Sequence, residues 1–87
     1  MKYRKKPLVI EAIKYLGPFS LDEMVETWGS DFRDKCKFLG DPGTLLIHTL
    51  EGYMYPAIGD YVIRGIKEEF YSCKPDIFEA SYDKVEE

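Results

Sequence analysis

The sequence predicts an α+β fold: a mostly antiparallel β-sheet of about five or six strands with one α-helix packed on it. Three observations lead to this class. Short runs of β-branched and aromatic residues are separated by Gly, Pro and Asp, which is typical of strands joined by turns. One helical pattern, with its own start and stop signals, follows the first run. The 87 residues contain no internal repeat and no linker, so residues 1–87 are expected to form a single domain.

The first strand is expected within residues 7–16, PLVIEAIKYL, and begins at Pro7. Glu11 and Lys14 interrupt its apolar residues, so one face of this strand is expected to be partly wet.

The helix is expected in GPFSLDEMVETW, residues 17–28. Ser20 is the predicted N-cap, Glu23 completes a capping box with it, and Phe19 can pack onto Met24 as a hydrophobic staple. Gly29 is expected to end the helix. The apolar stripe that would face the core consists of Met24, Val25 and Trp28.

The remaining strands are expected to form an antiparallel meander. Residues 36–50 contain two apolar runs around GDPG (40–43), which has the chemistry of a tight turn. Residues 60–64 and 69–73 form the last hairpin, with its turn near GIKE. Pro75 then ends the ladder and can open a single helical turn in PDIFEAS.

The chain is acidic, with 12 Lys and Arg against 16 Asp and Glu and a formal net charge of −4. This balance argues against long, sequence-independent binding to nucleic acid, so neither DNA nor RNA is an expected partner. A small anionic ligand is compatible with it. No apolar run approaches the roughly 18 residues of a membrane span, and no cleavable signal is recognised, so a cytoplasmic protein without a membrane partner is expected.

The sequence favours no enzyme class, so no catalytic residue, metal or cofactor is predicted. His48 is the one histidine, and its spacing to Cys36 and Cys73 matches no structural zinc pattern. The two cysteines are expected to be free thiols in a reducing compartment. GDPG lacks the Lys and Ser or Thr of a phosphate-binding P-loop.

Strand alternation places aromatic rings beside cations in the last hairpin. Tyr61 and Ile63 are expected on one face of their strand, and Tyr71 on one face of the partner strand, near Lys67 and Lys74. Such a surface can stack a nucleobase and attract a phosphate. The alternative is ordinary packing, because Tyr is common on half-buried strands.

Four segments of the chain carry a family resemblance: MKYRKKPLVIEA (1–12), TLEG (49–52), GDYVIRG (59–65) and FYSCKPDIFEASY (70–82). Together they resemble a widespread family of small phage and prophage proteins, whereas residues 16–43 lie outside the likeness. The family's last hairpin commonly reads Lys-Gly-Glu-Phe-Tyr-Pro-Cys-Lys-Pro. This chain has Glu68 for that Gly and Ser72 for that Pro. Both differences affect the expected conformation of the turn more than the expected ligand site.

This family is similar to the phage anti-CBASS sponges, which bind cyclic dinucleotide immune signals without cleaving them. The resemblance implies a homo-oligomer, such as a tetramer, in the cytoplasm of an infected bacterial host. It also implies that the protein sequesters a 3′3′-cGAMP-like messenger and keeps the host effector inactive. A small domain has a thin core, which also favours self-association.

The expected ligand site combines rings and cations. Tyr61 and Tyr71, with Tyr53 or Tyr55 of a neighbouring subunit, are candidates to stack on the two bases. Arg binds phosphate in a bidentate manner and Lys as a point charge. The candidate phosphate ligands are Arg4, Lys5, Arg64, Lys67 and Lys74.

Two further candidates, Thr49 and Asp60, could read ribose hydroxyls or a guanine edge. Structural alternatives exist for these residues as well. Thr49 suits a strand, Asp60 suits a turn in which it bonds its own backbone, and Arg64 suits an exposed hairpin end. Tyr53 and Tyr55 could pack across strands.

Two other function classes stay open at this point. A phage accessory protein could bind a host protein by strand addition along EGYMYPAIGDY (51–61). A virion or assembly component is the third possibility. The strand TLLIHTL is apolar on both faces, so it is either central in a sheet or buried in an interface.

Overall fold

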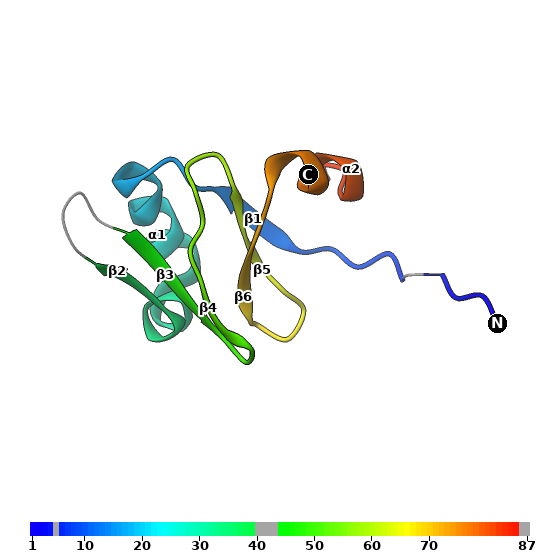
Figure 1. Ribbon diagram of the computed structural model, residues 1–87, viewed down its shortest axis with the longest axis horizontal. Helices are drawn as coiled ribbons and strands as arrows, with labels where there is room; N and C mark the ends of the chain where they lie inside the picture. The colour runs from blue at the N-terminus through cyan, green and yellow to red at the C-terminus, as the bar shows by residue number, and fades with distance from the viewer. Residues whose placement is uncertain (5, 40–43, 86–87) are drawn as a thin grey trace.

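The computed structural model describes residues 1–4, 6–39 and 44–85 of the chain. Within these residues it contains six strands and two helices (Figure 1). In chain order they are β1 (Glu11–Lys14), α1 (Pro18–Lys35), β2 (Cys36–Leu39), β3 (Thr44–Thr49), β4 (Gly52–Met54), β5 (Tyr61–Arg64), β6 (Phe70–Cys73) and α2 (Pro75–Ser81). The predicted α+β class is confirmed. The predicted GDPG turn lies outside the described residues.

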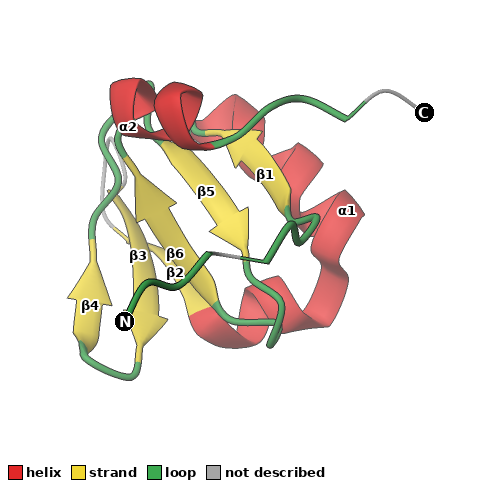
Figure 2. Ribbon diagram, turned by 90° about the vertical axis from the view of Figure 1, so that its right-hand side faces the viewer, coloured by secondary structure: helices red, strands yellow, loops and turns green. Residues whose placement is uncertain are grey.

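The strands form two antiparallel sheets of three strands instead of the single sheet expected from the sequence. Their orders are β1-β5-β6 and β2-β3-β4. Figure 2 shows β6 of the first sheet beside β3 of the second, and residues of these two strands are in contact. Helix α1 contacts strands of both sheets, so one helix covers the seam between them.

The expected meander is interrupted between β4 and β5. The Gly59 N–H donates to the Tyr15 carbonyl, and the Tyr15 N–H donates to the Asp60 carbonyl, both at 2.8 Å. These bonds anchor the chain at the end of β1, so β5 pairs with β1 and not with β4. Gly59 has a φ of +101°, a conformation that glycine adopts without a Cβ penalty.

Helix α1 begins earlier than the sequence predicts. Its N-cap is Gly17, and Pro18 occupies the first turn, where a preset φ and a missing N–H cost nothing. The Ser20 hydroxyl instead donates to the Gly17 carbonyl and accepts from the Leu16 N–H, at 2.7 and 2.9 Å. The capping box expected in residues 20–23 is therefore not formed. Phe19 is 88% exposed, so it makes no hydrophobic staple.

Gly29 interrupts α1 but does not end it. Its φ of +60° and ψ of −136° are non-helical and produce a kink, after which the helix continues to Lys35. The second segment brings Asp31, Phe32 and Lys35 over the β5–β6 hairpin, where all three make contacts. The kink therefore decides which helical side chains reach this hairpin.

An aromatic cluster joins the helix to β6. Phe70 is 1% exposed, and its ring centroid lies 5.1 Å from that of Trp28 and 5.6 Å from that of Phe32. The predicted stripe residues Met24 and Trp28 are buried, as expected, and Val25 packs at the margin of the core. The strands add Ile13, Leu45, Ile47 and Val62 to the same core.

No helix in the described part of the chain is both long and apolar enough to cross a membrane.

The turn between β5 and β6 generates a stability prediction. Glu68 has a φ of +63°, in the left-handed region that favours glycine. Glu68→Gly removes a left-handed strain of about 1 kcal/mol and loses an exposed ion pair with Arg64 worth less than about 1 kcal/mol. Glu68→Ala loses the same ion pair but keeps the strain.

We expect the Gly variant to be more stable than the Ala variant by about 1 kcal/mol, measured by urea denaturation. Equal stability of the two variants would contradict the assigned backbone conformation.

Candidate functional site

A cleft of about 680 Å³ opens between the β3–β4 turn and the β5–β6 hairpin. Its lining residues include the apolar Phe70 and Met54 and the basic Lys35 and Lys67. A volume of this size is typical of small-molecule sites, which lie within about 300–1,000 Å³. The cleft lies where the two sheets meet, so residues distant in the sequence line it together.

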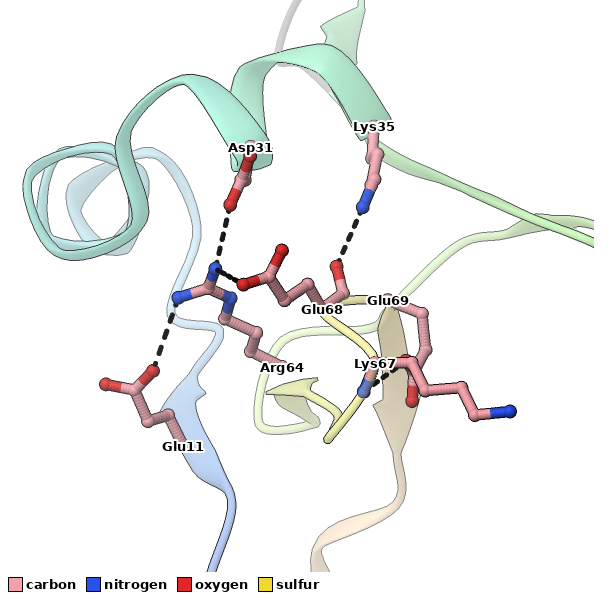
Figure 3. A network of polar contacts seen from close by, with 7 residues as sticks. All are labelled: Glu11, Asp31, Lys35, Arg64, Lys67, Glu68 and Glu69. Carbon is pink, nitrogen blue, oxygen red and sulfur yellow. Dashed lines mark hydrogen bonds and ion pairs between the residues drawn. The ribbon is translucent and has the colours of Figure 1, made fainter.

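The two lysines are held differently. Lys35 Nζ donates to the Glu68 carbonyl at 2.8 Å and lies 6.0 Å from the centroid of the Phe70 ring. The backbone N–H of Lys67 donates to Glu69 Oε2 at 3.0 Å, and Figure 3 shows its side chain extending away from the neighbouring acids. Among the described contacts of Lys67, none involves its ammonium group, which is therefore available to a ligand.

Gly65 allows Glu69 to fold over the turn. A Cβ at Gly65 would clash with Glu69 Oε1, so a larger residue would displace this carboxylate. Glu69 also lines the cleft, as does Glu51. The lining thus combines two cations with two carboxylates.

Tyr71 contributes a hydroxyl group that stays protonated at neutral pH. Burial raises its pKa to about 12, and a hydrogen bond with Tyr82 adds to this shift. The hydroxyl is thus already engaged by Tyr82.

Of the residues that the sequence singled out, Thr49, Lys67 and Tyr71 line this cleft. The Thr49 hydroxyl donates to the Gly52 carbonyl at 2.8 Å and accepts from the Glu51 N–H at 3.3 Å. Thr49 therefore stabilises the β3–β4 turn, in line with its structural alternative.

Three tyrosines lie elsewhere. Tyr61 shares a face of its sheet with Tyr71, as expected, but its ring stacks on Phe78 of α2 with centroids 3.9 Å apart. Tyr53 stacks across strands on His48 at 5.0 Å, and both Tyr53 and Tyr55 are largely exposed. Tyr61 instead lines a second hollow of about 380 Å³ with Phe78.

Arg64 is held by three carboxylates instead of facing the cleft. Its guanidinium lies 2.7 Å from Asp31, 3.4 Å from Glu68 and 3.7 Å from Glu11 (Figure 3). The Arg64 side chain is 22% exposed and its partners are 42–66% exposed, so it ties β1, α1 and the β5–β6 turn together at the surface. This arrangement assigns Arg64 a structural role.

The other candidates also lie away from the cleft. Asp60 is 5% exposed, and its Oδ2 accepts from the Ala57 N–H at 2.9 Å and from Lys74 Nζ at 3.4 Å. Asp60 is thus a turn residue, and Lys74 is its partner. Arg4 is exposed on the N-terminal segment, which projects from the body in Figure 1. Lys5 lies outside the described residues.

Sequence reasoning missed Lys35, Met54 and Phe70 as parts of a site. Phe70 was assigned to a strand, and Lys35 lies beyond the predicted end of the helix. The proximity of β3 and β6 has no local signature in the sequence, so the cleft could not be anticipated.

In the part of the chain that the structure describes, no group of three or more His, Cys, Asp or Glu side chains could hold a metal ion. Cys36 and Cys73 are free, as expected, and burial raises the pKa of the Cys36 thiol to about 12.

Comparisons with protein families, with characterised proteins and with solved structures find no match to this chain. The function of the cleft must therefore be inferred from its own side chains.

The structural role of Arg64 is testable by substitution. Arg64→Ala leaves Glu11, Asp31 and Glu68 facing one another without a cation, and we expect a loss of about 2 kcal/mol in the free energy of unfolding. Lys67→Ala removes an exposed cation from the same hairpin and should leave stability nearly unchanged. If the Arg64→Ala variant had the same free energy of unfolding as the wild type in urea denaturation, the structural role of Arg64 would be refuted.

Tyr71 predicts a loss of stability at high pH. Its pKa is raised in the folded protein from 10.0 to about 12, so the unfolded chain releases the proton first. This contribution is complete below pH 10 and is lost as the pH rises toward 12. Tyr71→Phe should therefore show a shallower decline than the wild type in alkaline denaturation. Parallel curves for the two proteins would contradict the shift.

Proposed function

We propose that this protein binds a cyclic dinucleotide of the 3′3′-cGAMP class in the cleft between the two hairpins and holds it without cleaving it. The observation that carries the proposal is the cleft of about 680 Å³, whose lining combines apolar side chains, two lysines and Tyr71. In an infected bacterial host, such binding would keep the messenger from its effector.

The cleft offers the phosphates of such a ligand two lysines, both of which lie beside the β5–β6 turn. Lys67 offers a whole ammonium group, whereas Lys35 uses one N–H on the Glu68 carbonyl and keeps two for a ligand. An ammonium group binds phosphate as a point charge, so it tolerates small differences in ligand pose.

The cleft also offers the bases of the ligand an apolar side chain and a hydrogen-bond acceptor. Met54 lines the cleft, and a flexible, polarisable thioether side chain favours contact with aromatic rings. Glu51 lines the same cleft, and a carboxylate can accept from the N–H groups of a guanine edge. Glu51 is therefore a better guanine reader than Asp60, whose carboxylate is engaged by Ala57 and Lys74.

The family resemblance of residues 49–52, 59–65 and 70–82 supports the choice of ligand class. Two of these segments contribute to the cleft, through Thr49 and Glu51 on one side and Tyr71 on the other. Sequestration without cleavage is likewise part of what this resemblance implies.

Ligand-dependent melting tests the proposal. Purified protein is heated with 3′3′-cGAMP, with other cyclic di- and trinucleotides, and with linear dinucleotides as controls. A ligand that binds only the folded state at about 100 times its Kd stabilises it by about 2.7 kcal/mol, so the melting temperature should rise. The ligand released by heating should be intact by mass spectrometry.

A matched pair of lysine variants locates the site. Lys67→Ala should weaken binding by roughly tenfold, because one charge-assisted contact is lost. Lys37→Ala removes an exposed cation from β2, outside the cleft, and should leave affinity unchanged. No melting shift with any cyclic nucleotide would sink the proposal, and equal weakening by both variants would move the site elsewhere. Fragmented ligand would mean catalysis instead of sequestration.

A further inference from the structure

Strand β4 has one edge that no described strand of this chain covers, because β4 pairs only with β3. Residues 52–59, GYMYPAIG, which contain this strand, carry no charge, although charged residues make up 32% of the whole chain. Natural edge strands are commonly protected from pairing by charged side chains. The β4 edge lacks this protection.

The same segment exposes large apolar side chains. Tyr53, Tyr55 and Ile58 are 59%, 64% and 73% exposed. Pro56 follows directly after Tyr55 and has no N–H to donate, so it limits the length over which another strand can pair. The edge is thus short, uncharged and aromatic, which suits a specific strand partner.

We propose that a second copy of this chain pairs with β4, antiparallel and edge to edge, around a two-fold axis at Met54. Two copies each carry a formal charge of −4, so they repel each other as they approach. The uncharged edge avoids this repulsion. A two-fold interface uses the same residues on both sides, and this edge is complementary to itself.

The proposed register follows from symmetry. A two-fold axis perpendicular to a sheet keeps each side chain on its own face, so Met54 lies opposite Met54 of the second copy. Tyr53 then faces Tyr55 of the second copy, and the reciprocal pair repeats on the other side. Aromatic cross-strand pairs stabilise antiparallel sheets. Gly52 falls opposite Pro56, which ends the ladder at both ends.

This pairing joins both β2-β3-β4 sheets into one sheet of six strands. Because Met54 also lines the cleft, the clefts of the two copies come to lie on either side of the axis. The pairing goes beyond the proposed function, since it holds whether or not a nucleotide binds.

Sedimentation equilibrium on the wild-type chain and two lysine variants tests the pairing. We expect the wild type to dimerise. The dimer dissociation constant of Tyr55→Lys should be roughly tenfold higher, because both aromatic pairs are lost. Tyr3→Lys makes the same change at a tyrosine that is 88% exposed on the N-terminal segment, and it should dimerise like the wild type. Circular dichroism checks that all three proteins are folded.

A monomeric wild type, or a Tyr55→Lys variant that dimerises as tightly, would overturn the pairing. The register is tested by Met54→Cys in a Cys73→Ser chain treated with oxidised glutathione. Directly opposed residues of antiparallel strands have Cα atoms about 4.5–5.5 Å apart, within reach of a disulfide. We expect a covalent dimer, and its absence from a non-covalent dimer would refute the Met54 axis.

Discussion

The ring of Phe70 packs against Trp28 and Phe32 and so joins β6 to helix α1. Phe70 belongs to β6, at the edge of one sheet, and its ring lies under the helix that covers both sheets. Burial of such a ring contributes about 1.5–3 kcal/mol, a large share in a domain with a thin core. Because this contact fixes β6 beside β3, it also creates the seam where the cleft opens.

Polar contacts with the second segment of α1 hold the β5–β6 hairpin in place beside this seam. Arg64 holds Asp31 of the second segment of α1, and Lys35 of the same segment donates to the Glu68 carbonyl in the β5–β6 turn. Both contacts exist because the helix resumes after Gly29. The position of Lys67 beside the cleft therefore depends on a kink in a distant helix.

Local features of the fold were predictable from the sequence, and the seam was not. Alternation predicted the β5–β6 hairpin and the shared face of Tyr61 and Tyr71, and Pro75 marked the start of α2. The pattern of a strand shows which of its faces is apolar but not which other strand pairs with it. The sequence therefore predicts one sheet where the structure has two. For the same reason Arg64 and Asp60 resembled ligand contacts, since their carboxylate and backbone partners come from other segments.

Methionine methyl resonances test ligand binding in the cleft, because Met1, Met24 and Met54 report three different places in the chain. Met54 lines the cleft, Met24 is buried in the core and Met1 is fully exposed on the N-terminal segment. On titration of the methyl-labelled protein with 3′3′-cGAMP, we expect a saturable shift of the Met54 signal while the other two stay in place. An unmoved Met54 signal at saturating ligand, or a shift confined to Met1 or Met24, would contradict it.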